Sequence, residues 1–248
     1  MQLDYDILKK LIQSTDINNL SPAELQSLFT EELTSFLPRG ITKIDQRDEM
    51  PVIFNEARAN RPHDNGATKA VDKAESCVIC DGRITGIIDL AEISSGFTFI
   101  NKNLYPVVFP LTAYDHLPVH AQPVTGYHFL QWTSTQHELD WHNMPLDDLV
   151  VVLNRLAALE EWLLQAGPDL LKSPAESIYV SIGKNFGRLV GGSLIHGHQQ
   201  IAVTNLQPRR IRDHVRFQQT HGQVFSEYMR THNDPLLTVR TYPSARLA

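Results

Sequence analysis

The clearest periodic pattern in the chain runs from Pro145 to Ala166. Apolar residues recur there every three or four positions, two aspartates stand in the first turn, and Gly167-Pro168 follows. This pattern predicts an amphipathic helix that ends at Gly167. A second helix is predicted to begin at the capping-box sequence Ser21-Pro22-Ala23-Glu24 and to continue to Pro38.

Segments with strand-like patterns occupy much of the remaining chain. The sequence becomes strand-like from Ile84, and strands are predicted in GFTFINKNLYPVVFPL, YHFLQWTST, SIYVSIG and LIHGHQQIAVT. Residues 39–76 are polar and irregular, and the polar segment after Pro208 is predicted to be helical to about Thr231. Since the elements do not alternate regularly as βαβ units, we expect an α+β fold with an antiparallel sheet.

The strand LIHGHQQIAVT carries an unusual concentration of polar side chains. Because successive side chains of a strand alternate between faces, His196, His198 and Gln200 should share one face, with Ile195 and Ile201 on the other. An imidazole can attack phosphorus and hold a nucleotidyl group covalently if its second nitrogen keeps a proton. The pattern therefore favours a reactive site over a structurally paired set of buried histidines.

Donors for a phosphate group surround these histidines in the sequence. The amide of Gln200 can donate to a phosphate oxygen, and so can Ser193 and the glycine-rich backbone before it.

Composition and charge restrict the classes of partner. The chain has 248 residues, 42% of them apolar, with a formal net charge of −6, which disfavours general nucleic-acid binding. No apolar run approaches the roughly 18 residues that a membrane span requires. The N-terminus lacks the features of a signal peptide. We therefore expect no nucleic-acid or membrane partner and a cytoplasmic location.

The two cysteines, Cys77 and Cys80, form a CxxC sequence. In a reducing compartment such a pair is either half of a metal site or a redox pair. The following DGRITG is typical of a turn rather than of the helix that usually follows a redox pair. The spacing favours a metal, with the redox pair as the alternative.

The segment NFGRLVGGSLIHGHQQ resembles the active-site segment of galactose-1-phosphate uridylyltransferase, a family of the histidine-triad superfamily. That family reads approximately N-x-G-x-x-x-G-x-S-x-x-H-P-H-G-Q. The matching positions are Asn185, Gly187, Gly191, Ser193, His196, His198 and Gln200. The chain departs from the pattern at Gly197, where the family has proline, and at Gln199, where it has glycine.

The resemblance implies a histidine-triad-like antiparallel sheet flanked by helices, and it assigns roles to the matching residues. His198 would be the nucleophile that accepts a nucleoside monophosphate. Gln200 and Ser193 would hold the phosphate oxygens, and Asn185 would contact the phosphate within the loop that contains Gly187 and Gly191.

The resemblance also implies a structural zinc ion bound by Cys77, Cys80, His196 and one further histidine. His137 is favoured as that ligand and His142 is the alternative, whereas His116 and His120 are weaker candidates. The family's additional iron site is not expected, because His214 stands where the family has a glutamate.

Three further residues are implied on the substrate side. FNEARANRPHDNG resembles the family's R-x-x-R-P segment, so Arg58 and Arg61 are expected to bind phosphate through their planar guanidinium groups. Without the resemblance, that segment would be interpreted as a solvated loop. Asn101 falls where family members have an asparagine in the nucleotide pocket.

The resemblance extends from about Arg58 to Pro208. We expect residues 1–50 to form an N-terminal helical extension and residues 51–248 to form the catalytic domain. The full-length transferase of that family has a second half, which supplies sugar-binding residues and to which the resemblance does not extend. Members of that family form dimers, so the resemblance is compatible with a homodimer.

The function implied is transfer of a nucleoside monophosphate between a nucleotide sugar and a sugar 1-phosphate through a nucleotidyl-histidine. One alternative is a phosphorylase that cleaves a dinucleoside polyphosphate or a nucleotide sugar with inorganic phosphate. The other alternative is a catalytically silent nucleotide-binding module, which the retained H-x-H-x-Q sequence disfavours.

Overall fold

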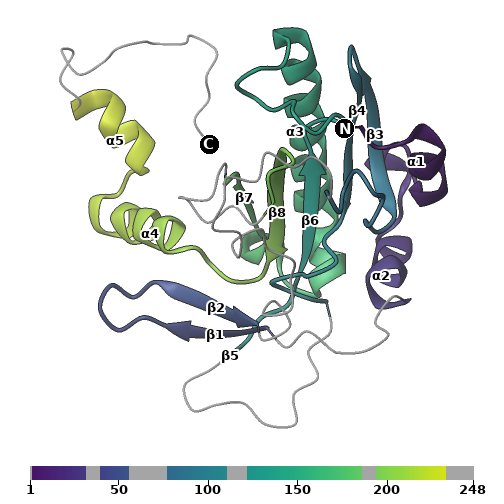
Figure 1. Cartoon of the computed structure of the whole chain (residues 1–248). Coiled ribbons are helices and arrows are strands. Elements are labelled where there is room, and N and C mark those ends of the chain that lie inside the picture. The colour runs from purple at the N-terminus through teal and green to yellow at the C-terminus, as the bar shows by residue number, and fades with distance from the viewer. Residues whose placement is uncertain (1, 32–39, 56–76, 111–121, 186–193, 233–248) are drawn as a thin grey trace. The chain divides into compact units, whose positions relative to one another are not determined.

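The computed structural model of the chain describes residues 2–31, 40–55, 77–110, 122–185 and 194–232 (Figure 1). Contacts divide the chain into two units, Met1–Lys43 with Val52–Leu206 and Ile44–Pro51 with Gln207–Ala248. The predicted boundary at residue 50 stays a prediction. Among the described residues, no helix is long and apolar enough to cross a membrane.

A five-stranded antiparallel sheet forms the centre of the first unit. Its strand order is β3-β4-β6-β8-β7 (Figure 1). The strands are β3 (Ile87–Ile93), β4 (Gly96–Lys102), β6 (Gly126–Trp132), β7 (Tyr179–Gly183) and β8 (His198–Thr204). The predicted α+β class with an antiparallel sheet is confirmed.

A second, smaller sheet has the order β2-β1-β5. Its strands are β1 (Gly40–Ile44), β2 (Pro51–Asn55) and β5 (Gln122–Pro123). The prediction that residues 39–76 are irregular is therefore wrong over residues 40–44 and 51–55, and residues 56–76 lie outside the described residues. The strands β1 and β2 are short and separated by a polar turn, so the sequence there shows no regular alternation of apolar and polar residues. The pairing of β1 with the distant β5 is likewise not visible in the sequence.

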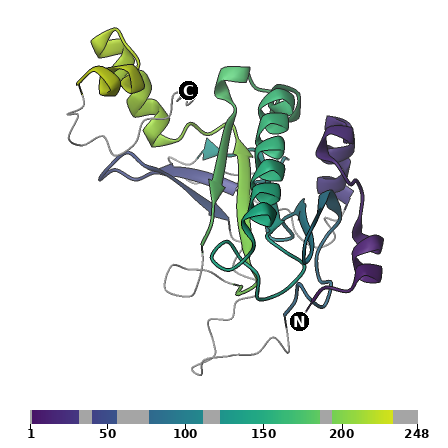
Figure 2. The ribbon, with the colours of Figure 1, turned by 90° about the horizontal axis from the view of Figure 1, so that it is seen from above.

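The long helix α3 (Leu146–Leu171) covers one face of the five-stranded sheet (Figure 2). The predicted end at Gly167 is wrong, because the helix continues through Pro168 to Leu171 and is capped by Lys172, which adopts the left-handed conformation. A proline inside a helix removes one backbone hydrogen bond. Burial of Leu170 and Leu171 in the core offsets that loss.

Two short helices and one 3-10 turn precede the sheet, α1 (Tyr5–Leu11), η1 (Ile17–Asn19) and α2 (Pro22–Glu31). The predicted capping box is confirmed: the Ser21 N–H donates to Glu24 Oε2 over 2.8 Å, and the Glu24 N–H donates to Ser21 Oγ over 3.2 Å. Phe29 of α2 packs its ring edge-on against the aromatic rings of Tyr127 and Phe129 in the core.

A partly buried set of ion pairs around Asp89 joins the segment before η1, strand β3 and helix α3. The Arg155 guanidinium of α3 donates through Nε to Asp89 Oδ2 over 2.8 Å, and its Nη2 contacts both Asp89 Oδ1 and Asp16 Oδ1. The 3-10 turn η5 (Ala175–Ser177) leads from α3 into β7.

The second unit contains α4 (Arg209–His221) and α5 (Phe225–His232). The single helix predicted from Pro208 to Thr231 is interrupted, because Gly222 adopts a positive φ of 70° and its N–H donates to the Gln218 carbonyl. Glycine readily adopts this conformation and so ends α4.

Candidate functional site

Four metal-ligand side chains from three loops of the first unit converge. Cys77 and Cys80 lie in the turn before β3, His137 follows β6, and His196 precedes β8. Their ligand atoms all lie within 4.8 Å of one another. The Nδ1 atom of His196 is 3.7 Å from Cys77 Sγ and 3.5 Å from Cys80 Sγ, and His137 Nδ1 is 3.7 Å from Cys80 Sγ.

These distances fit a tetrahedral zinc site. Zinc–sulfur and zinc–nitrogen bonds of ordinary length, at the tetrahedral angle, separate a sulfur from a nitrogen by about 3.6 Å. The second ring nitrogen of His196, Nε2, donates to the Ser134 carbonyl over 2.8 Å, so the lone pair of Nδ1 faces the cysteines. His142 is exposed and lies outside the cluster, so His137 is the fourth member.

Burial gives the cluster the electrostatic character of a cation site. Desolvation lowers the pKa of His196 to about 4, which keeps its ring neutral and its lone pair available. Desolvation and the neighbouring Cys77 raise the pKa of the Cys80 thiol to about 12, so a thiolate there requires a nearby cation. The residues present therefore fit a metal ion, and they fit zinc in particular by the chemistry of their donors.

His198 has a defined tautomer. Its Nδ1 lies 2.8 Å from the His196 carbonyl oxygen, and since a carbonyl can only accept, Nδ1 carries the proton. The lone pair is therefore on Nε2. The ring is only 7% exposed and packs 5.0 Å from the Trp132 ring, and desolvation lowers its pKa, which favours the neutral form. A backbone carbonyl thus performs the tautomer selection that a nucleophilic histidine requires.

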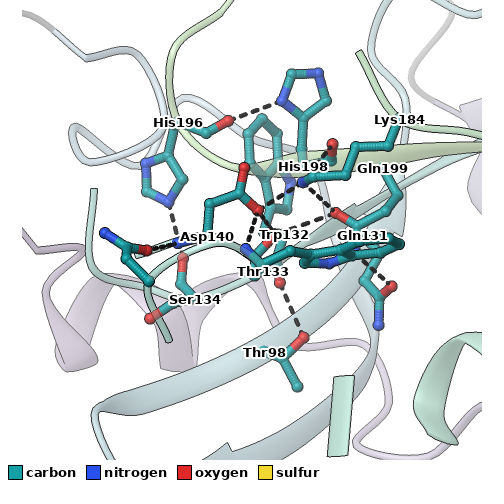
Figure 3. A network of polar contacts seen from close by, with 12 residues as sticks. Thr98, Gln131, Trp132, Thr133, Ser134, Asp140, Lys184, His196, His198 and Gln199 are labelled. Atoms are coloured by element: carbon teal, nitrogen blue, oxygen red, sulfur yellow. Dashed lines mark hydrogen bonds and ion pairs between the residues drawn. The ribbon is translucent and has the colours of Figure 1, made fainter. Parts of the chain in front are cut away.

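The two histidines face different surroundings (Figure 3). The prediction that His196, His198 and Gln200 share one strand face is wrong for His196, because β8 begins only at His198. Both His198 and Gln200 line one cavity, as their alternation predicts, whereas the His196 ring turns towards the cysteines.

The cavity has a volume of about 250 Å³ and lies on the face of the sheet opposite α3. Its walls are mostly apolar and a few polar groups converge in it, which is typical of a small-molecule site. The apolar lining residues are Val78, Ile79, Ile84, Leu104, Leu130 and Leu194, with the rings of Tyr105 and Trp132. The polar ones are Arg83, Thr85, Asn101, Asn103, His198 and Gln200.

Asn101 lines this cavity but is bonded within the protein. Its Nδ2 donates to the Lys102 carbonyl over 2.8 Å and to Thr85 Oγ1 over 3.2 Å, and its Oδ1 accepts from Trp132 Nε1 over 2.8 Å. These bonds fix the Trp132 ring that packs on His198. A contact of Asn101 with a nucleotide stays a prediction.

The remaining predicted residues are not brought into the cavity by the described structure. Asn185 is exposed just after β7. Outside the described residues lie Arg58, Arg61, His116, His120, Gly187, Gly191 and Ser193.

Sequence reasoning missed some neighbours of the site. Arg83, at the cavity, keeps 72% of its side chain exposed and pairs with Asp81 over 3.7 Å. The position of Arg83 directly after the CxxC turn could have identified it as a neighbour of the site. Lys184 and Asp140, next to His198, belong to no recognisable motif, and Gln199 was noted only as a departure from the family pattern.

Neither a protein-family model nor a curated protein matches the sequence. Solved structures do match. A uridylyltransferase structure superposes with a TM-score of 0.53 at 20% identity, over 82% of this chain and 59% of that chain. A uridylyltransferase mutant structure superposes with a TM-score of 0.53 at 18% identity, over 79% of this chain and 56% of that chain.

The chain has the uridylyltransferase fold. The predicted likeness to that family is thus confirmed at the level of the fold, and this chain spans less than two thirds of the length of either structure. An ADP-glucose phosphorylase from Arabidopsis thaliana is more distant, with a TM-score of 0.44 at 17% identity, over 73% of this chain and 55% of that chain.

Proposed function

We propose that this protein is a nucleotidyltransferase that moves a nucleoside monophosphate between a nucleotide sugar and a sugar 1-phosphate through a covalent intermediate on His198. The observation that carries the proposal is the hydrogen bond from His198 Nδ1 to the His196 carbonyl. It leaves Nε2 unprotonated on a ring that lines a cavity together with the amide of Gln200.

In the first half-reaction, the Nε2 lone pair of His198 attacks the α-phosphorus of the donor. A nitrogen–phosphorus bond forms, the bond from phosphorus to the bridging oxygen breaks, and that oxygen leaves with its electron pair as part of the sugar 1-phosphate. In the second half-reaction, a phosphate oxygen of the acceptor attacks the same phosphorus and releases the imidazole. Such double displacement produces ping-pong kinetics.

Catalysis of this kind depends on alignment and on stabilising the developing charge of the phosphate. The amide of Gln200, which lines the cavity, would donate to a phosphate oxygen there. The proposal further assigns Ser193, Asn185, Arg58 and Arg61 to the phosphate groups. Asn101 is assigned to the nucleotide side of the cavity.

A zinc ion bound by Cys77, Cys80, His137 and His196 would have four protein ligands, and its chemistry would be structural. Its bond to His196 would hold the backbone two residues before the nucleophile. The Nε2–H bond from His196 to the Ser134 carbonyl orients that ligand from outside the site.

Trapping of the intermediate tests the proposal. The protein is incubated with UDP-glucose, ADP-glucose or diadenosine tetraphosphate, each alone, and its intact mass is measured. We expect an acid-labile gain of one nucleoside monophosphate, absent from His198→Ala and retained by His142→Ala, which changes an exposed histidine outside the cluster.

The acceptor then separates the alternatives. Discharge of the adduct by a sugar 1-phosphate supports the transferase, whereas discharge by inorganic phosphate alone would assign a phosphorylase. If no donor labels the wild-type protein, the chain is a binding module and the proposal fails. A homodimeric assembly and a cytoplasmic location stay predictions.

A further inference from the structure

A polar network lies next to His198 (Figure 3). It centres on Gln199, which is fully buried and, as the next residue of β8, points away from the cavity. Gln199 Oε1 accepts from Thr133 Oγ1 over 3.1 Å and from Lys184 Nζ over 3.2 Å. Its Nε2 donates to Gln131 Oε1 over 3.1 Å, which anchors the network in the middle of the sheet.

The network contains a buried ion pair. Lys184 Nζ lies 2.6 Å from Asp140 Oδ1, and the two side chains are only 15% and 4% exposed. The same ammonium group lies 3.4 Å from the His198 carbonyl and 5.1 Å from the centre of the Trp141 ring. Burying two charges costs desolvation energy, so the pair is tolerated only where its partners are held in defined positions.

Asp140 occupies the space that a side chain at position 197 would need. A Cβ atom on Gly197 would lie 2.8 Å from Asp140 Cγ and 3.0 Å from Asp140 Oδ1. The glycine therefore admits the carboxylate against the backbone between the two histidines. Gly197 and Gln199 are also the two positions at which the chain departs from the uridylyltransferase pattern, and both departures belong to this one network.

Ordinary sheet pairing holds the stretch before β8 only weakly. Regular β8 pairing begins with His198 opposite Trp132, and the preceding residue adds one backbone bond, from the Thr133 N–H to the Gly197 carbonyl over 3.0 Å. Besides the bond of the His196 ring to the Ser134 carbonyl, the position of the His196 carbonyl, which selects the tautomer of His198, therefore depends on what packs against Gly197 and Gln199.

We propose that Lys184, Asp140 and Gln199 are positioning residues that hold the backbone around His198 so that its Nδ1 stays bonded to the His196 carbonyl and its Nε2 faces the cavity. The expected loss of activity rests on the proposed function, but the expected change in the tautomer of the His198 ring does not.

The first test uses a pair of glycine variants. Gly197→Ala places a methyl group against Asp140, whereas Gly183→Ala, in the neighbouring strand, meets none of the described residues within 4 Å. With the transfer reaction as the assay, Gly197→Ala should lower kcat roughly 10- to 100-fold, the loss expected when a reacting group shifts by about 1 Å, with KM unchanged. Gly183→Ala should behave like the wild type.

The second test removes the ion pair itself. Lys184→Met alone would leave a buried, unpaired carboxylate and so destabilise the fold. The double variant with Asp140→Asn and Lys184→Met removes both charges, and it should show the same loss in kcat with the wild-type content of bound metal. The single variant Lys184→Arg keeps the positive charge beside Asp140 and should retain more activity than the double variant.

A readout that needs no substrate is the tautomer of His198, measured by nitrogen-15 NMR of the histidine rings and assigned with His198→Ala. The wild type should show a single Nδ1–H tautomer, and the double variant should show both tautomers. If the double variant keeps the single tautomer, the positioning role is refuted, whatever happens to its activity or its metal content.

The two proposals can fail separately. A wild-type protein that forms no adduct, with a tautomer that changes in the double variant, would overturn the proposed function and support the positioning role. A wild-type protein and a double variant that form the adduct at equal rates would support the function and overturn the positioning role.

Discussion

Removing one ligand of the four-residue cluster should destabilise the protein. The size of the loss depends on how many residues lie between that ligand and the other ligands. His137→Ala is the informative change, because His137 joins the cluster from a loop of its own, after β6. With zinc bound, the cysteine turn and the β6 loop are cross-linked. Loss of His137 opens that link but leaves both cysteines and His196 in place.

The magnitude follows from the length of chain that the link closes. His137 and Cys80 are 57 residues apart, and for a loop of that length the chain-entropy relation for a cross-link gives about 4 kcal/mol at 25 °C. For a chain of this size, that loss corresponds to a fall in Tm of roughly 10 °C.

Thermal unfolding and metal analysis together check the prediction. The wild type should contain one zinc ion per chain and should melt at a lower temperature after a strong chelator removes it. His137→Ala should melt roughly 10 °C below the wild type, and the chelator should lower its Tm less. His142→Ala is the matched control, since this exposed histidine lies outside the cluster. A wild type without bound zinc, or a His137→Ala protein that melts like the wild type, would refute the reasoning.

Two further changes test the packing that supports the site. Gly167→Ala would place a Cβ atom 2.5 Å from Ile178 Cγ2 and should destabilise the fold by about 1–3 kcal/mol in urea unfolding, whereas Gly183→Ala should not. Arg155→Met leaves the fully buried Asp89 carboxylate without its cation and should cost about 3–5 kcal/mol in the same assay, part of which Asp89→Asn should restore.

Local sequence predicted the elements whose stabilising interactions are local. The capping box at Ser21 was predicted correctly because its donors and acceptors lie within three residues of each other. The body of α3 was predicted from its apolar periodicity. Its end was not, because Gly167 and the last turn of the helix are buried by packing against residues outside the helix, such as Ile178, which the local sequence does not encode.

The candidate site, too, was predicted from the sequence only in part. The residue types and spacing of Cys77, Cys80, His196 and His198, with the family resemblance, predicted a metal cluster beside a reactive histidine. The choice of His137 over His142 needed the structure, because the two are only a few residues apart and differ in which one the turn after β6 brings to the cysteines.

The sequence by itself thus determined the fold class, the CxxC half-site and the stretch that carries the proposed nucleophile, since these depend on local pattern and residue chemistry. Only the tertiary structure decided that β8 starts at His198, that the His196 ring turns to the cysteines, and that a carbonyl selects the His198 tautomer. It also brought Asp140 and Lys184 together behind that strand. The metal-ligand cluster and the ion pair join loops dozens of residues apart, and no local periodicity encodes which loops meet. The bond from His198 to the His196 carbonyl spans only two residues, but no local periodicity encodes where β8 begins.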